Sequence, residues 1–118
     1  VLAPGGLLLN FDANWYRYLW DDQAQKGHAR DRENLKASDV RDENAATDVD
    51  AMEAIARQTP LSRQARPQWD LKTLRALGMQ AQADPDIWQQ VWTREERINN
   101  ASTPMFLVEG RKAKLSEN

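Results

Sequence analysis

Three segments of the chain have the apolar patterns of β-strands. Residues 7–11 open with three consecutive leucines after a Pro-Gly-Gly turn, and such an unbroken run is typical of a parallel strand covered on both faces. Apolar and polar residues alternate over 79–84, and residues 104–110 form a last apolar run. The sequence therefore predicts three strands, with Asp12 at the carboxyl end of the first and with Pro85 interrupting the second.

Two other segments have helical spacing. Over residues 47–59, apolar side chains recur at intervals of three and four, and Thr47 stands at the position of a helix cap. Over residues 71–77 the leucines face one way, Asp70 stands at the cap position and Gly78 follows the last turn. We expect a helix in each segment, the second of them short.

The remaining segments are less regular. Residues 21–46 carry many charges of both signs and few apolar side chains, which suits either a solvated helix or a mobile segment. Residues 87–88 are expected to resume the interrupted strand, residues 93–103 to form a polar connection, and the charged tail at 111–118 to be frayed.

Composition narrows the class of protein. The chain has 118 residues and a net charge of -2, so it lacks the basic surface that binds nucleic acid. It has no cysteine and no apolar run of membrane-spanning length, and we expect a cytoplasmic protein without disulfides. Five tryptophans are many for this length, and such large side chains are expected either in the core or around an aromatic-lined pocket.

Four motifs follow one another along most of the chain. They are Leu2-Ala3-Pro4-Gly5-Gly6 before the strand that ends at Asp12, Arg66-Pro67-x-Trp69-Asp70, Leu74-x-x-Leu77-Gly78-Met79, and Ser102-Thr103-Pro104-Met105-Phe106-Leu107-Val108. In this order they resemble the C-terminal portion of class I S-adenosylmethionine-dependent methyltransferases, from the fifth strand onward. The resemblance implies an α/β fold, namely the C-terminal part of a Rossmann-like sheet with an inserted helical segment, which would be α+β as an isolated fragment.

The resemblance also implies an organisation of the chain. Residues 1–20 would form the fifth-strand region and the crevice loop, residues 21–60 a helical insertion that covers the substrate, and residues 61–118 the last helix and an antiparallel strand pair. In this family the fifth strand pairs with the fourth on one side and with the seventh, antiparallel, on the other. Because a buried strand opens the chain and no initiator methionine precedes it, we expect the back part of a larger protein.

The family's activity implies a cofactor and partners. The intact protein would use S-adenosylmethionine and a small-molecule methyl acceptor. The family binds this donor mainly through a glycine-rich loop after its first strand, and no such loop occurs among the glycines here. We therefore expect this chain to bind no donor and to be inactive alone. A bare apolar strand edge recruits other chains, so we also expect self-association through residues 7–11.

Polar and aromatic side chains gather just after the first strand. Asp12, Asn14, Trp15 and Tyr16 stand where the carboxyl ends of strands form a ligand crevice, and they are the candidate substrate-binding residues. Asp12 or Tyr16 could take a proton from the acceptor, although no catalytic residue is assigned. A structural role is the alternative, with the acid capping the next helix and the two aromatic rings packed in the core.

Other conspicuous residues have simpler interpretations. His28, the only histidine, is expected at the surface, and with neither a second histidine nor a thiol we expect no metal site. Arg63 and Arg66 flank a loop and are also expected at the surface. The two tryptophans at positions 88 and 92 are spaced as neighbours on a helix, which favours a core or subunit-contact pair over a ligand clamp.

Two alternatives to the methyltransferase interpretation stay open at the level of sequence. The first is a non-enzymatic α+β module that holds a protein partner with its tryptophans and amphipathic helices. The second is a regulatory or structural domain of an unrelated α/β enzyme, because a Pro-Gly-Gly turn before a strand also fits other doubly wound folds.

Overall fold

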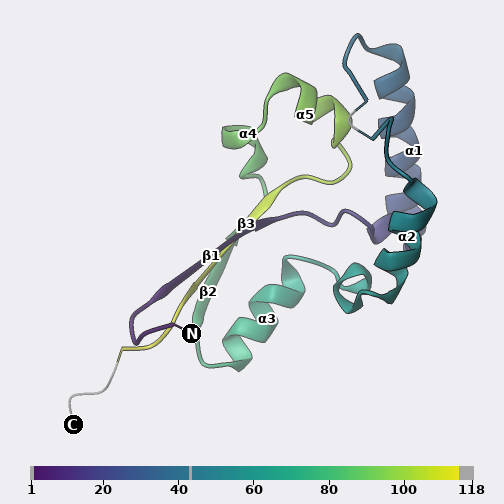
Figure 1. Cartoon of the computed structure of the whole chain (residues 1–118). Coiled ribbons are helices and arrows are strands. Elements are labelled where there is room, and N and C mark those ends of the chain that lie inside the picture. Colours follow the sequence, from purple (N-terminus) through teal and green to yellow (C-terminus); the bar gives the residue numbers. More distant parts are fainter. Residues whose placement is uncertain (1, 43, 115–118) are drawn as a thin grey trace.

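The protein is a small mixed α+β structure built around a three-stranded antiparallel sheet. The computed structural model describes residues 2–42 and 44–114. The strands are β1 (Leu7–Asp12), β2 (Gln80–Asp84) and β3 (Phe106–Arg111). Their order in the sheet is β1-β3-β2, and β3 runs antiparallel to both neighbours, so β1 and β2 point the same way (Figure 1). All three predicted strands are confirmed.

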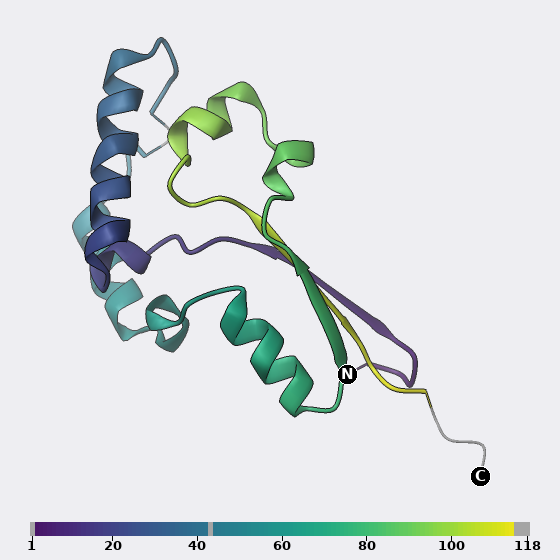
Figure 2. The same cartoon turned by 180° about the vertical axis from the view of Figure 1, so that it is seen from behind.

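Helices connect the strands, and all of them except α3 lie toward one end of the sheet (Figures 1 and 2). Their bounds are α1 Asp22–Ala37, α2 Val49–Gln58, α3 Gln68–Ala76, α4 Trp88–Val91 and α5 Arg94–Asn99, with the 3-10 turns η1 Arg17–Leu19 and η2 Pro60–Arg63. Helix α3 lies alongside the sheet, whereas α1 and α2 stand beyond the carboxyl end of β1 (Figures 1 and 2). None of the helices in the described part of the chain is long and apolar enough to cross a membrane.

The most deeply buried side chains of the described residues lie on one face of the sheet, and further buried apolar side chains lie on helices and loops: Ala13, Leu35, Ala56, Ile87 and Trp92. Phe106 and Val108 of β3 are 2% and 1% exposed, and Gly110 on the same face lets Leu74 and Met79 approach so closely that an added Cβ would lie 3.2 and 3.1 Å from them. Helix α3 therefore packs tightly against this face, and it is the central strand that loses its contact with water.

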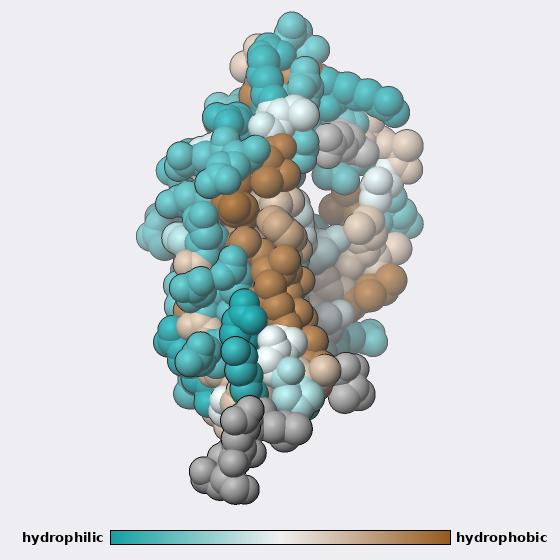
Figure 3. Space-filling model, turned by 90° about the vertical axis from the view of Figure 1, so that its left-hand side faces the viewer, coloured by the Kyte–Doolittle hydropathy of each residue, from teal (hydrophilic) through white to brown (hydrophobic). Residues whose placement is uncertain are grey.

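The opposite face of β1 is open, which corrects the expectation that this strand is covered on both faces. Leu7, Leu9 and Phe11 point away from α3 and remain 45–50% exposed. Leu8, on the α3 side, is still 37% exposed. Figure 3 shows the resulting apolar band along this side of the molecule. An unbroken apolar run indicates that a strand is buried in the complete fold, but it does not indicate which residues pack against that strand.

Helix α3 ends as predicted and begins differently. Gly78 adopts φ 82°, its N–H donates to the Arg75 carbonyl at 3.0 Å, and the N–H of Met79 donates to the Leu74 carbonyl at 3.1 Å, the pattern of a glycine-terminated helix. The helix starts at Gln68, so Asp70 lies within its first turn and is not its cap, which corrects that expectation. The Asp70 carboxylate instead has a partner described below.

The charged segment after residue 21 contains a regular helix, which resolves the alternative left open by its composition. The Asp21 carboxylate caps α1 by accepting the N–H groups of Gln23 and Ala24 at 2.9 and 3.1 Å. Its buried face consists of Gly27, Asp31 and Leu35, spaced four residues apart. Because one of these residues is a glycine and another is an aspartate, they do not form an apolar stripe from which hydropathy alone would predict a helix.

Three local predictions are wrong. Asp48 caps α2 by accepting the N–H of Ala51 at 3.0 Å, in place of Thr47. Residues 87–88 do not resume a strand but lead into the short helix α4. The polar connection contains α5, which starts at a capping box between Thr93 and Glu96. Of the tail expected to be frayed, residues 115–118 lie outside the described residues, and residues 112–114 form neither helix nor strand.

Candidate functional site

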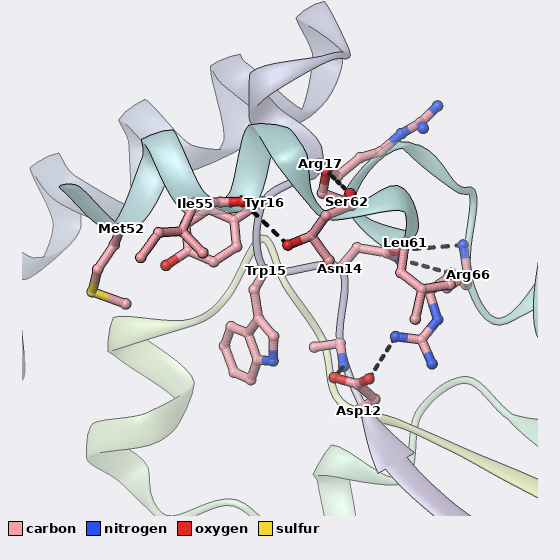
Figure 4. A pocket seen from close by; sticks show the side chains of 13 residues that line it. Asp12, Asn14, Trp15, Tyr16, Arg17, Met52, Ile55, Leu61, Ser62 and Arg66 are labelled. Carbon is pink, nitrogen blue, oxygen red and sulfur yellow. Dashed lines mark hydrogen bonds and ion pairs between the residues drawn. The ribbon is translucent and has the colours of Figure 1, made fainter. Parts of the chain in front are cut away.

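A pocket opens at the carboxyl end of β1, between the segment that leaves this strand and helix α2. We call it the β1-end pocket; it has a volume of about 400 Å³. Its lining residues are Asp12, Ala13, Asn14, Trp15, Tyr16, Arg17, Met52, Ile55, Ala56, Thr59, Leu61, Ser62 and Arg66 (Figure 4). The pocket is thus made by three segments: residues 12–17, helix α2 with the turn η2, and the loop before α3.

All four predicted site residues line this pocket. Asp12 is the last residue of β1, and Asn14, Trp15 and Tyr16 follow it directly. Trp15 remains 42% exposed, so its ring is not packed in the core. Asp12 does not cap a helix either, because its Oδ1 accepts the N–H of Ala13 at 2.8 Å and its Oδ2 faces an arginine. The structural alternative raised from the sequence therefore does not describe these two residues.

Arg66 joins the pocket to the first turn of α3. Its Nη1 lies 2.5 Å from Asp12 Oδ2, and its Nε and Nη2 each donate to one oxygen of Asp70 at 2.9 Å. The hydrogen bonds to Asp70, and next those to Asp12, raise the pKa of the Arg66 guanidinium, against the opposing effect of its desolvation. Its guanidinium carbon also lies 5.4 Å from the centre of the Phe106 ring. The cationic end is enclosed on several sides.

The burial of Arg66 corrects the expectation that it lies at the surface. The whole residue is 9% exposed, and Asp70 is 8% exposed. The sequence carried a signal for this pair, because an arginine and an aspartate four residues apart share one side of a helical turn. It carried none for the contact with Asp12, which lies 54 residues away in the chain. Arg63, in contrast, is exposed as expected.

Asn14 holds the pocket's segments together through the same loop. Its Nδ2 donates to the carbonyl of Arg66 at 2.6 Å, and its Oδ1 accepts the N–H of Arg66 at 3.2 Å. The side-chain amide thus bonds both the N–H and the carbonyl of one residue, as the backbone of a neighbouring strand does. Because these bonds engage both ends of the amide, Asn14 holds the segment after β1 against the loop before α3.

Helix α2 supplies the apolar wall. Its apolar side was correctly predicted from sequence spacing, but only Ala56 of that side is buried. Met52 and Ile55 line the pocket and are 43% and 68% exposed. They stand across the pocket from Trp15 in Figure 4. This side of the helix faces a space that a ligand of suitable shape would fill.

A second pocket of about 590 Å³ lies beside the first and shares Trp15, Tyr16 and Met52 with it. His28 lines it and stacks on Tyr18 with ring centres 3.9 Å apart. This histidine is half-buried, which corrects the expectation that it lies at the surface. The Tyr18 hydroxyl donates to Glu53 at 2.7 Å. Burial, and then this hydrogen bond, raise the pKa of the Tyr18 phenol well above its ordinary value of 10.0.

The described residues offer no group of three or more His, Asp or Glu side chains that could hold a metal ion. The glycines also have uses in the fold: Gly27 lies in α1 against Ser102, Gly78 ends α3, and Gly110 lies under α3. Within the described residues, none forms a glycine-rich turn from a strand into a helix, the feature expected of a methyl-donor site.

Comparison of this chain with models of known protein families, with curated proteins and with solved structures gave no match.

Proposed function

We propose that this chain is the C-terminal part of a class I S-adenosylmethionine-dependent methyltransferase and forms the acceptor side of its site. The strand order carries this proposal. The resemblance implies that the last strand pairs with the fifth strand and runs antiparallel to the other strands. The order β1-β3-β2, with β3 antiparallel to β1 and β2, has this arrangement. A simple three-stranded meander would instead place β2 in the centre.

The position of the pocket supports the same proposal. In open α/β sheets, ligands bind beyond the carboxyl ends of the parallel strands. The β1-end pocket lies at that end of β1, and helix α2, in the segment inserted between β1 and α3, forms one of its walls. In the proposed enzyme this insertion covers a small-molecule acceptor, and Asp12, Trp15 and Tyr16 contact it.

The open edge of β1 supports a larger sheet. Lys112 donates its N–H to the Gly6 carbonyl at 2.9 Å, which marks these two as a hydrogen-bonded pair. Because hydrogen-bonded and non-hydrogen-bonded pairs alternate along antiparallel strands, the backbone groups of Leu7, Leu9 and Phe11 point away from β3. Within the described residues they have no hydrogen-bond partner, so a further strand on the far side of β1 could bond to them. In the proposed enzyme this neighbour is a parallel strand of the remaining sheet.

The overall dimensions agree with a missing neighbour. The chain exposes 8400 Å², whereas a compact monomer of this length exposes about 6500 Å². Its radius of gyration is 17.1 Å, against about 13–14 Å for a compact domain of the same length. The structure is therefore elongated, 62 × 31 × 24 Å, and it leaves apolar surface uncovered that further protein would bury.

In isolation, residues 1–118 have two expected properties. The chain binds no S-adenosylmethionine and transfers no methyl group, because the donor loop is not among its residues. It also self-associates, because two copies of β1 can pair edge to edge through the backbone groups that point away from β3. Micromolar binding of the donor in calorimetry would refute the first property, and a monodisperse monomer in solution scattering would refute the second.

The decisive experiment is to read the coding frame upstream of Val1 and to assay its full product. A strand followed by a glycine-rich loop about 100 residues upstream, together with donor binding by the full product, is the expected result. A full product that ends the sheet at β1 and binds no donor would exclude the methyltransferase. The open edge of β1 would then favour the second candidate, a module that holds a partner by adding the partner's strand to its sheet.

A further inference from the structure

The β1-end pocket combines an apolar wall with one accessible carboxylate. The side chain of Asp12 is 30% exposed, whereas those of Arg66 and Asp70, which lie behind it, are 8% and 10% exposed. Arg66 also lines the pocket, but a molecule there meets more of the Asp12 side chain than of the Arg66 side chain. The other side of the pocket is formed by Trp15 and the apolar face of α2.

The charges around the pocket leave an excess of negative charge. Arg66 is shared by two carboxylates, those of Asp12 and Asp70. The second arginine of the lining, Arg17, lies 3.5 Å from Asp21, which balances it. Three carboxylates thus face two guanidinium groups, which gives the cluster a net charge of -1, and Asp12 is its one carboxylate in the pocket lining. Only Arg66 and Asp70 are largely removed from water, whereas the side chains of Asp12, Arg17 and Asp21 are 30%, 29% and 36% exposed.

The carboxylate of Asp12 also has acceptor capacity to spare. An ionised carboxylate can accept about four hydrogen bonds, two on each oxygen. The structure uses one on each oxygen, from the Ala13 N–H at 2.8 Å and from Arg66 Nη1 at 2.5 Å. One acceptor position on each oxygen is left for a donor that enters from the pocket. An ammonium group supplies several such donors together with the opposite charge.

We propose that the β1-end pocket binds a small organic cation, an ammonium group carried on a flat apolar body. The ammonium group lies at Asp12, and the body lies between Trp15 and the side chains of Met52 and Ile55 on α2. The aromatic rings of Trp15 and Tyr16 add attraction, because a cation close to such a ring is stabilised by the ring's negative face. A volume of about 400 Å³ limits the ligand to a small molecule.

Under the proposed function this amine is the methyl acceptor, and only that role rests on the proposed function. The binding itself follows from the charge and shape of the pocket. It is therefore tested without a methyl donor, on the protein expressed from its complete coding frame. The probes are 2-phenylethylamine, 2-phenylethanol and 3-phenylpropionate, which have similar bodies and carry positive, no and negative charge.

Calorimetric titrations with the three probes measure the preference. We expect the amine to bind on the order of tenfold more tightly than the alcohol, and the carboxylate probe to bind most weakly. Equal affinities for the amine and the alcohol, or tighter binding of the carboxylate probe, would overturn the proposal.

Variants of pocket residues show which side chain causes the preference for the amine probe. Asp12→Asn is expected to remove the preference for the amine and to leave the affinity for the alcohol unchanged. Asp12→Glu keeps the charge and the preference, so it tests the proposal even if Asp12→Asn fails to fold. Asp50→Asn is the matched control, because it removes one exposed carboxylate from α2 outside the pocket lining and is expected to change neither affinity. Trp15→Ala lowers the affinity for both probes. A preference that survives Asp12→Asn would overturn the assignment to Asp12.

The two proposals fail in different ways. Tight and selective amine binding by a full product without transferase activity would refute the proposed function and leave this inference intact. Methyl transfer to a neutral or anionic acceptor, with no preference for the amine probe, would refute the inference and leave the proposed function intact.

Discussion

The ion-pair network around Arg66 gives the sharpest test of the structure. Replacing Arg66 by methionine keeps an unbranched side chain and removes the charge. The carboxylate of Asp70, whose side chain is 10% exposed, then loses both of its hydrogen bonds at 2.9 Å and stays buried without a partner. Asp12, 30% exposed, recovers part of its hydration. The destabilisation therefore comes mainly from Asp70.

The expected magnitude is large for this chain. Breaking a buried ion pair by removing one partner destabilises a protein by about 3–5 kcal/mol, and the exposure of Asp12 places the loss near the lower figure. A domain of this length is stable by about 6–18 kcal/mol, and this small core favours the low end. The loss is then on the order of half of the free energy of unfolding. With a urea dependence of about 1.5 kcal/mol per molar, the unfolding midpoint falls by about 2 M.

Urea denaturation followed by far-UV circular dichroism measures this shift. Arg63→Met is the matched control: Arg63 is exposed and its guanidinium lies 4.2 Å from the centre of the Trp20 ring, an interaction of about 0.5–1 kcal/mol. The double variant Arg66→Met/Asp70→Leu removes the buried charge as well and regains most of the stability, because apolar replacement of a whole buried pair is nearly neutral. A midpoint for Arg66→Met that matches the control, or a double variant no more stable than the single one, would refute the reasoning.

Three other predictions follow from particular contacts. Gly27→Ala is expected to destabilise the fold by about 1–3 kcal/mol, because the new Cβ would lie 2.8 Å from Ser102 Cβ. This loss is expected although alanine favours a helix. Thermal unfolding measures it, and adding Ser102→Gly should reverse part of it. The raised pKa of Tyr18 means that its proton stabilises the fold fully below pH 10 and that this stabilisation is lost as the pH rises further. The unfolding midpoint should thus fall more between pH 9 and 11 in the wild type than in Tyr18→Phe, and equal falls would contradict this. Leu9→Lys, at a position 50% exposed on the open side of β1, should abolish self-association in light scattering and leave stability nearly unchanged.

Local signals explain which elements could be predicted. The three strands, helix α2 and the glycine-terminated end of α3 depend on spacings and turn residues within a few positions, and all of them form as expected. The capping box between Thr93 and Glu96 was equally local and was missed, because the segment after it is short and polar. The sequence left open whether residues 21–46 form a helix or a mobile segment, for another reason. The buried face of α1 contains a glycine and an aspartate, and both lie against Ser102, far away in the chain.

The candidate site likewise has residues that the sequence predicted and contacts that it did not predict. The sequence placed Asp12, Asn14, Trp15 and Tyr16 at the end of a strand, and the structure brings all four to one pocket. It did not place Arg66 there, because the partners of a buried charge are chosen by the fold and Asp12 lies 54 residues away. Nor did it predict that Asn14 pairs with the backbone of Arg66 and so acts as a positioning residue.

The sequence by itself thus determined the three strands, helix α2, the end of α3 and the resemblance that proposes a methyltransferase, because period and turn chemistry act over neighbouring residues. Only the tertiary structure decided the strand order, the open edge and face of β1, and the ion-pair cluster at the pocket. These depend on which distant segments meet, and hydropathy along a chain does not encode that. The same three leucines that indicate a buried strand lie half exposed here, because burial is a property of neighbours and not of the side chain alone.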